Sequence, residues 1–78
     1  MKGGAFIMDM KEMIELSLVH ANMTKTDIGR HFGISQPSIS GRIKAGRFKK
    51  EDLEEIAHVM GAEYHSYFEF PDGAKFGD

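Results

Sequence analysis

The feature of this sequence that most constrains its fold is a pair of short helical patterns separated by Gly33. In each pattern two large apolar side chains stand four residues apart, so they share one face of a helix. Gly33 tolerates the left-handed backbone that ends a helix, and Ser35 soon after it is a favoured N-cap residue. The sequence therefore predicts helices over 25–32 and about 35–45, joined by a tight turn.

Two more helices are expected around this pair. Asp9 and Glu12 have the spacing of a capping box and precede apolar residues at helical intervals, which predicts a helix over 10–21. Apolar residues recur at the same intervals up to Met60 and are followed by Gly61, which predicts a helix over 50–60.

The residues after Gly61 change in character. They are rich in aromatic side chains that favour strands, and the Pro71-Asp72-Gly73 sequence is typical of a turn. We therefore expect a β-hairpin that pairs 64–70 with 74–76. Because residues 1–8 show no periodicity, they are expected to be a disordered N-terminus.

The chain of 78 residues is short enough for one domain, divided here into a helical region over 9–61 and a hairpin over 62–78. A domain of this size has a small core and often needs additional stabilisation. The sequence has no cysteine that could form a disulfide. We therefore expect a mainly α, cytoplasmic protein that forms a homodimer and does not enter a membrane.

The charged residues are distributed unevenly. Residues 25–50 contain seven basic side chains and one acidic side chain, a net charge of +6 within a chain whose overall charge is −2. Residues 51–78 contain eight acidic side chains and one basic side chain. A basic middle segment suits contacts with phosphate groups, although it is also compatible with an ordinary solvated surface.

The helix pair also has the small and apolar positions of a known motif. Gly29 lies where the helix over 25–32 would pack closely on the helix over about 35–45, a position at which only alanine or glycine fits. The helix over about 35–45 starts with the residues Gln36-Pro37-Ser38-Ile39-Ser40. With these features, residues 9–61 resemble the Cro/repressor helix-turn-helix family of transcriptional regulators, the xenobiotic-response-element class. The resemblance implies a four-helix Cro/repressor-like domain that binds double-stranded DNA with its third helix in the major groove.

The resemblance also implies which residues face the bases. Four positions match base-facing positions of the family, and a helical projection with Ile39 and Ile43 directed inward agrees with them. Arg42 is added as a further candidate for sequence readout. The expected base-reading residues are Gln36, Pro37, Ser40, Gly41 and Arg42. Gly41 has two readings, a functional one in which the helix backbone approaches DNA closely, and a structural one in which the glycine makes a tight contact within the protein or is simply tolerated.

Phosphate contacts are expected at the start of the second helix and after the third. A helix N-terminus with hydroxyl groups can bind phosphate, and Thr24 can equally be an ordinary N-cap. The expected phosphate-binding residues are Thr24, Lys25, Thr26, Lys44, Arg47, Lys49 and Lys50.

The aromatic hairpin has two readings. It can pair with the hairpin of a second subunit, or it can cover the helical core of its own chain. The residues expected to form the dimer contact are Tyr64, Tyr67, Phe68 and Phe70.

No pattern points to catalysis or to a cofactor. The four histidines lack metal-ligand spacing within a helix, and no serine or threonine has a recognisable nucleophile context. We therefore expect neither an enzyme nor a metal site. The main expectation is a sequence-specific DNA-binding regulator, with repression as its expected action. The alternative is an antitoxin-like or other protein-interaction module, suggested by the acidic, aromatic segment 63–78.

Overall fold

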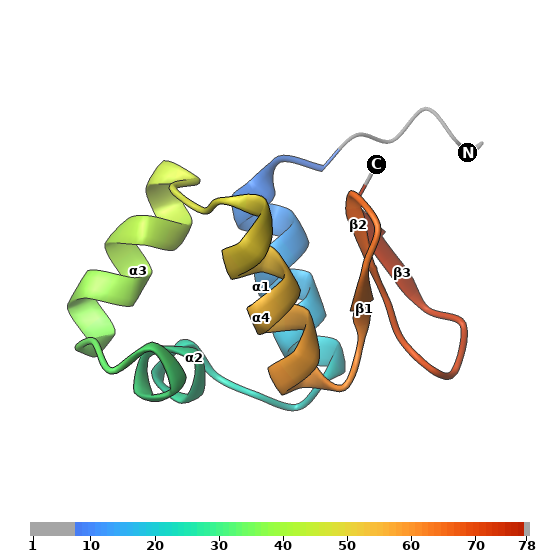
Figure 1. The fold of residues 1–78 in the computed structure, drawn as a ribbon, viewed down its shortest axis with the longest axis horizontal. Coiled ribbons are helices and arrows are strands. Elements are labelled where there is room, and N and C mark those ends of the chain that lie inside the picture. The colour runs from blue at the N-terminus through green and yellow to red at the C-terminus, as the bar shows by residue number, and fades with distance from the viewer. Residues whose placement is uncertain (1–7, 78) are drawn as a thin grey trace.

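Four helices are followed along the chain by a small antiparallel sheet. The computed structural model describes residues 8–77. Its elements are α1 (Met10–His20), α2 (Lys25–Phe32), α3 (Gln36–Ala45), α4 (Lys50–Met60), β1 (Glu63–Tyr64), β2 (Tyr67–Glu69) and β3 (Lys75–Gly77). Figure 1 shows α2 and α3 at one end of the molecule, the sheet at the other, and α1 and α4 between them. The four predicted helices are confirmed, and the mainly α class with them.

Local capping interactions set the helix bounds. The Asp9 carboxylate accepts a hydrogen bond from the backbone N–H of Glu12 at 2.8 Å, and Thr24 caps α2 through the N–H of Asp27 at 3.2 Å. Ser35 caps α3 in the same way. Gly33 ends α2 at a φ of 72°, a backbone conformation that strongly favours glycine. Gly33 and Ser35 are the signals that predicted the helix pair, and Asp9 is the signal that predicted the start of α1.

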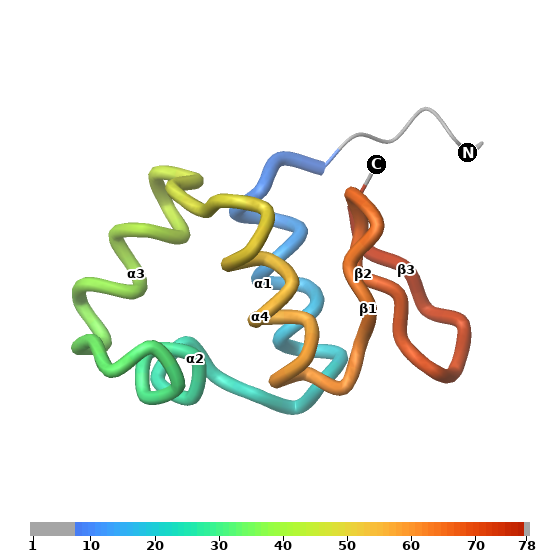
Figure 2. Tube along the Cα trace, in the orientation of Figure 1, coloured from blue at the N-terminus to red at the C-terminus, as the bar shows by residue number. Residues whose placement is uncertain are grey.

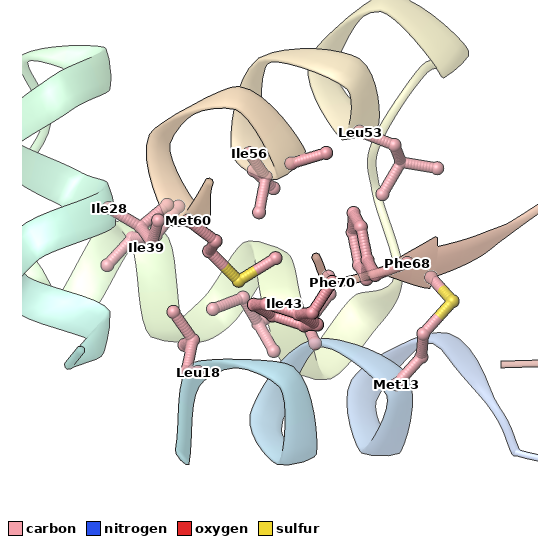
Figure 3. Packing of buried hydrophobic residues seen from close by; sticks show 12 residues of the cluster. Met13, Leu18, Ile28, Ile39, Ile43, Leu53, Ile56, Met60, Phe68 and Phe70 are labelled. Carbon is pink, nitrogen blue, oxygen red and sulfur yellow. The ribbon is translucent and has the colours of Figure 1, made fainter. Parts of the chain in front are cut away.

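The core draws side chains from all four helices and from the sheet. Figure 3 shows Met13 and Leu18 of α1 facing Leu53 and Ile56 of α4, with Phe70 between them. Seven residues, among them Phe68, are buried almost completely. Burying a large apolar side chain stabilises a fold by about 1.5–3 kcal/mol relative to leaving it exposed. The sheet is therefore a structural part of this core.

The sheet differs from the predicted two-stranded hairpin. The expected single strand over 64–70 is divided by Ser66, which has a φ of 85°. This left-handed residue reverses the chain, so β1 pairs antiparallel with β2 and Tyr64 lies opposite Phe68. The predicted turn at Pro71–Gly73 does form and leads into β3, which pairs with the other side of β2.

The burial of the aromatic residues corrects the expected dimer contact. Phe68 is 0% exposed and Phe70 is 6% exposed, because both pack on the helices. Neither side chain can meet a second subunit while the core is intact. Tyr64 and Tyr67 remain partly exposed. Of the two readings of the hairpin, coverage of its own core accounts for Phe68 and Phe70.

The chain trace in Figure 2 shows how the sheet joins the helices. Strands β2 and β3 pack against α1, while β1 packs against α4. The expectation of disorder over residues 1–8 falls outside the described residues except for Met8, which is partly buried against the core. Among residues 8–77, no helix combines the length and apolar character needed to cross a membrane.

Candidate nucleic-acid interface

The contact between α2 and α3 depends on a glycine. A Cβ atom placed on Gly29 would lie 3.0 Å from the carbonyl oxygen of Ile34 and 3.1 Å from Cγ2 of Ile39. Both distances are shorter than ordinary packing allows, and the oxygen belongs to the backbone. The prediction of a close helix contact at Gly29 that admits only alanine or glycine is confirmed for glycine, while these distances disfavour alanine. This close contact holds α3 directly against α2.

Helix α3 has one buried face and one exposed face. Ile39 and Ile43 are 0% exposed and hold the helix on the core. The opposite face consists of short or polar side chains and one lysine. The exposed residues on it are Gln36, Pro37, Ser38, Gly41 and Lys44, and Ser40 is partly exposed. The predicted outward face of the helix is confirmed for Gln36, Pro37, Gly41 and Lys44, and in part for Ser40, whereas Ser38 was not predicted there.

Gln36 and Ser40 form a pair on the exposed face. The Gln36 Nε2 group donates a hydrogen bond of 2.9 Å to the Ser40 hydroxyl, one helical turn away. The bond restrains the amide, while its carbonyl oxygen and its second N–H stay available to solvent. The amide of Gln36 therefore presents one acceptor and one donor side by side on the outside of α3.

Gly41 lies in the middle of this face. Apart from its chain neighbours and the nearby backbone of α3 itself, no atom of the described chain lies within 4 Å of a Cβ built on Gly41, so no packing contact explains the glycine. A tight contact within the protein is therefore wrong for Gly41, whereas close approach of the backbone to DNA and simple tolerance of a glycine both stay open. A shallow hollow passes over this position and is lined by Ile34, Ser38, Gly41, Arg42, Ala45 and Arg47. Because Gly41 has no side chain, the backbone of α3 is accessible to solvent at this position.

Arg42 does not belong to the exposed set. Its guanidinium donates to the carboxylate of Asp52 and to the carbonyl oxygen of Arg47, each at 3.3 Å. The same group lies over the ring of Phe48, 4.7 Å from the centroid. These contacts tie α3 to the start of α4, and the assignment of Arg42 to base reading stays a prediction.

The predicted phosphate contacts separate into two groups. Lys25 is held by Glu15 of α1 at 2.7 Å, and hydrogen bonding to this lysine lowers the pKa of the Glu15 carboxyl. Lys50 lies 3.9 Å from Glu54 and remains largely exposed. Among the predicted phosphate-binding residues, three exposed cations pair with no carboxylate of residues 8–77; they are Lys44, Arg47 and Lys49.

The N-terminus of α2 already carries a negative charge. The Asp27 carboxylate accepts hydrogen bonds from the Thr24 backbone N–H at 2.8 Å and from its hydroxyl at 3.0 Å. The backbone bond is the larger reason why the pKa of Asp27 lies below its ordinary value. A phosphate bound at the N-terminus of α2 would therefore lie beside the negatively charged carboxylate of Asp27. Thr24 is an N-cap, and Thr26 beside it is exposed.

Sequence reasoning missed two residues of the exposed face. Ser38 and Ala45 line the hollow beside Gly41 but were not among the expected base-reading positions. Their spacing of three and four residues from Gly41 places them on the same helix face, so the helical projection contained the signal.

Neither the protein-family models, nor the curated proteins, nor the solved structures contain a match to this chain.

Proposed function

We propose that this protein is a sequence-specific DNA-binding regulator that reads the major groove with α3 and acts as a homodimer. The observation that carries the proposal is the exposed face of α3. It combines the restrained Gln36–Ser40 pair, the open backbone at Gly41 and the side chain of Lys44. Arg47 follows just after the helix, and neither cation pairs with a carboxylate among residues 8–77.

The shape of this face supports insertion into a groove. The major groove of B-DNA is about 12 Å wide and admits one α-helix. Pro37 and Gly41 carry no long side chain that would hold the helix axis away from the bases. The absence of an internal contact at Gly41 supports the reading in which the helix backbone approaches DNA closely.

The Gln36 amide supports a preference for adenine. With one N–H committed to Ser40, the amide offers one donor and one acceptor outward. Adenine presents the complementary pair in the major groove, the N7 acceptor and the N6 donor, whereas guanine presents two acceptors. Each good bidentate contact discriminates by about 1–3 kcal/mol against the wrong base.

The cations near the end of α3 supply the contacts that do not depend on sequence. Lys44, Arg47 and Lys49 are free of internal ion pairs among residues 8–77, so binding phosphate breaks no salt bridge there. Lys25 is less suited because it would first leave Glu15. We assign the phosphate contacts chiefly to these three cations.

A homodimer would place two copies of α3 on successive turns of the same DNA face, about 34 Å apart. Strand β3 lies at an edge of the sheet, and an edge strand can pair with another chain. On α1, Leu16 is 42% exposed and Val19 is 76% exposed, which adds apolar surface outside the core. These features support self-association, which sedimentation equilibrium will measure.

The test is selection of bound sequences from a random duplex DNA pool at two salt concentrations. We expect an inverted repeat with half-sites about one helical turn apart and an adenine at the position read by Gln36. Gln36→Ala should remove the adenine preference and keep the salt dependence. Lys44→Gln should do the reverse, weakening all sequences and reducing the slope of log affinity against log salt by about 0.9.

These outcomes separate the parts of the proposal. Salt-sensitive binding without any selected sequence would refute sequence-specific readout. Failure to bind DNA at both salt concentrations would refute the function itself and favour a protein-interaction module. An unchanged base preference in Gln36→Ala would show that another residue makes the contact.

A further inference from the structure

Two carboxylates face each other on the outer surface of the sheet. The register of β1 and β2 places Glu63 directly opposite Glu69, and both lie on the side of the sheet away from the buried Phe68. Like charges directly opposite in an antiparallel pair destabilise a sheet. A cation between them would remove that repulsion.

A histidine completes the group. The turn at Ser66 brings His65 back over this surface, with its Nε2 atom 3.1 Å from Oε1 of Glu63 and 3.5 Å from Oε1 of Glu69. One ligand atom from each of the three residues lies within 4.8 Å of the others. All three side chains are accessible to solvent, since between 37% and 78% of each is exposed.

We propose that Glu63, His65 and Glu69 bind a divalent transition-metal ion of the zinc class. Zinc takes imidazole nitrogen and carboxylate oxygen at about 2.0–2.2 Å in a tetrahedron. Two ligands at that distance lie roughly 3.4 Å apart, close to the two separations seen here. The imidazole favours zinc over magnesium or calcium, which take oxygen ligands.

The surroundings leave room for the ion. A surface hollow beside the three residues is lined by both carboxylate-bearing residues and by His58. It can admit the water that would occupy a fourth coordination position. Lys75 is opposite Glu69 in the register, and its Nζ lies over the ring of Tyr67, 5.6 Å from the centroid. On the other side, Lys50 and Glu54 line a surface hollow together with His65.

The sequence spacing does not reveal this site, because its ligands meet across two strands. His65 and Glu63 are only two residues apart, and Glu69 comes from the neighbouring strand. The competing reading is an ion pair in which a protonated His65 alone bridges the carboxylates. The two readings differ in their response to metal, since a ligating imidazole must be deprotonated.

The test is titration of the full chain with zinc chloride at neutral pH, followed by calorimetry and by thermal unfolding. We expect one zinc ion per chain and a rise in melting temperature with zinc that is absent with magnesium. His65→Ala should weaken zinc binding by more than about tenfold. Removing a residue that only hydrogen-bonds a metal ligand already weakens binding by at least about tenfold, and His65 is proposed as a ligand itself. The matched control is His31→Ala, because His31 faces a single carboxylate, Glu55, at 2.7 Å.

Glu69→Gln is a second variant for the case in which His65→Ala does not fold. It keeps the size of the side chain and removes one ligand charge, so it should also weaken zinc binding. The proposal is overturned if zinc does not bind, if magnesium stabilises equally, or if His31→Ala weakens binding as much as His65→Ala.

Discussion

Replacing Gly41 by alanine tests both the structure of α3 and its proposed use. Glycine inside a helix is less favourable than alanine by about 0.8–1.0 kcal/mol. Gly41 is the sixth residue of a ten-residue helix, and an added methyl group would meet no atom within 4 Å. The full propensity gain should therefore appear as stability. We expect the free energy of unfolding to rise by about 1 kcal/mol, and Tm by about 4–8 °C.

The same methyl group should weaken DNA binding if the backbone of α3 approaches the bases. Overpacking a close contact costs about 1–3 kcal/mol, which corresponds to a loss of affinity of roughly 5- to 150-fold. Urea unfolding measures the first effect and fluorescence anisotropy with a labelled operator measures the second. A variant that is more stable and binds DNA less well is the combined result expected.

Gly29→Ala is the matched control for this experiment. Its added methyl would lie 3.0 Å from the Ile34 carbonyl oxygen, so the same substitution should destabilise the protein, by about 1 kcal/mol. Equal stabilities for the two variants would refute the packing described for α2 and α3. Stabilisation by Gly41→Ala with unchanged DNA affinity would refute the close approach of the backbone.

Three further predictions concern stability. Phe68→Ala should cost about 3–5 kcal/mol in urea unfolding, because it empties a fully buried site, and a loss below 1 kcal/mol would contradict a core role for the sheet. Arg42→Ala should cost about 1–2 kcal/mol through its Asp52 ion pair and aromatic contacts, whereas a wholly DNA-contacting residue would leave stability unchanged. The pKa of Asp27 is lower in the folded state than in the unfolded state. Asp27 should therefore contribute to the free energy of unfolding at pH values above its unfolded-state pKa, and this contribution should be lost as the pH falls through its folded-state pKa. Asp27→Asn should flatten that acid-side dependence, and an unchanged profile would exclude the cap.

The helix bounds were predictable because their causes are local. Asp9, Thr24 and Ser35 each cap the helix that follows them, and Gly33 and Gly46 end helices at positive φ. These interactions span a few residues, so the printed sequence contains both partners. The inward direction of Ile39 and Ile43 followed from helical spacing for the same reason.

The features of the fold and of the candidate site that the sequence does not predict depend mainly on contacts between residues distant in the chain. The division of the expected strand rests on Ser66 at a φ of 85°, a conformation that serine rarely adopts and that no local pattern signals. Arg42 lies on the expected helix, yet its side chain contacts Asp52 and Phe48, which reach it only after α4 folds back. The sequence therefore predicts which residues α3 exposes better than it predicts which of them are engaged elsewhere.

The burial of Phe68 and Phe70 has a consequence for how the chain folds. Their places in the core lie among side chains of α1 and α4, so the helices alone leave that apolar surface open to water. A fragment ending near residue 61 would lack these two aromatic rings and expose their partners to aggregation. Helices and sheet should therefore unfold in one cooperative transition. The free energies of opening measured by amide hydrogen exchange should then be equal for the most protected residues of α1 and β2.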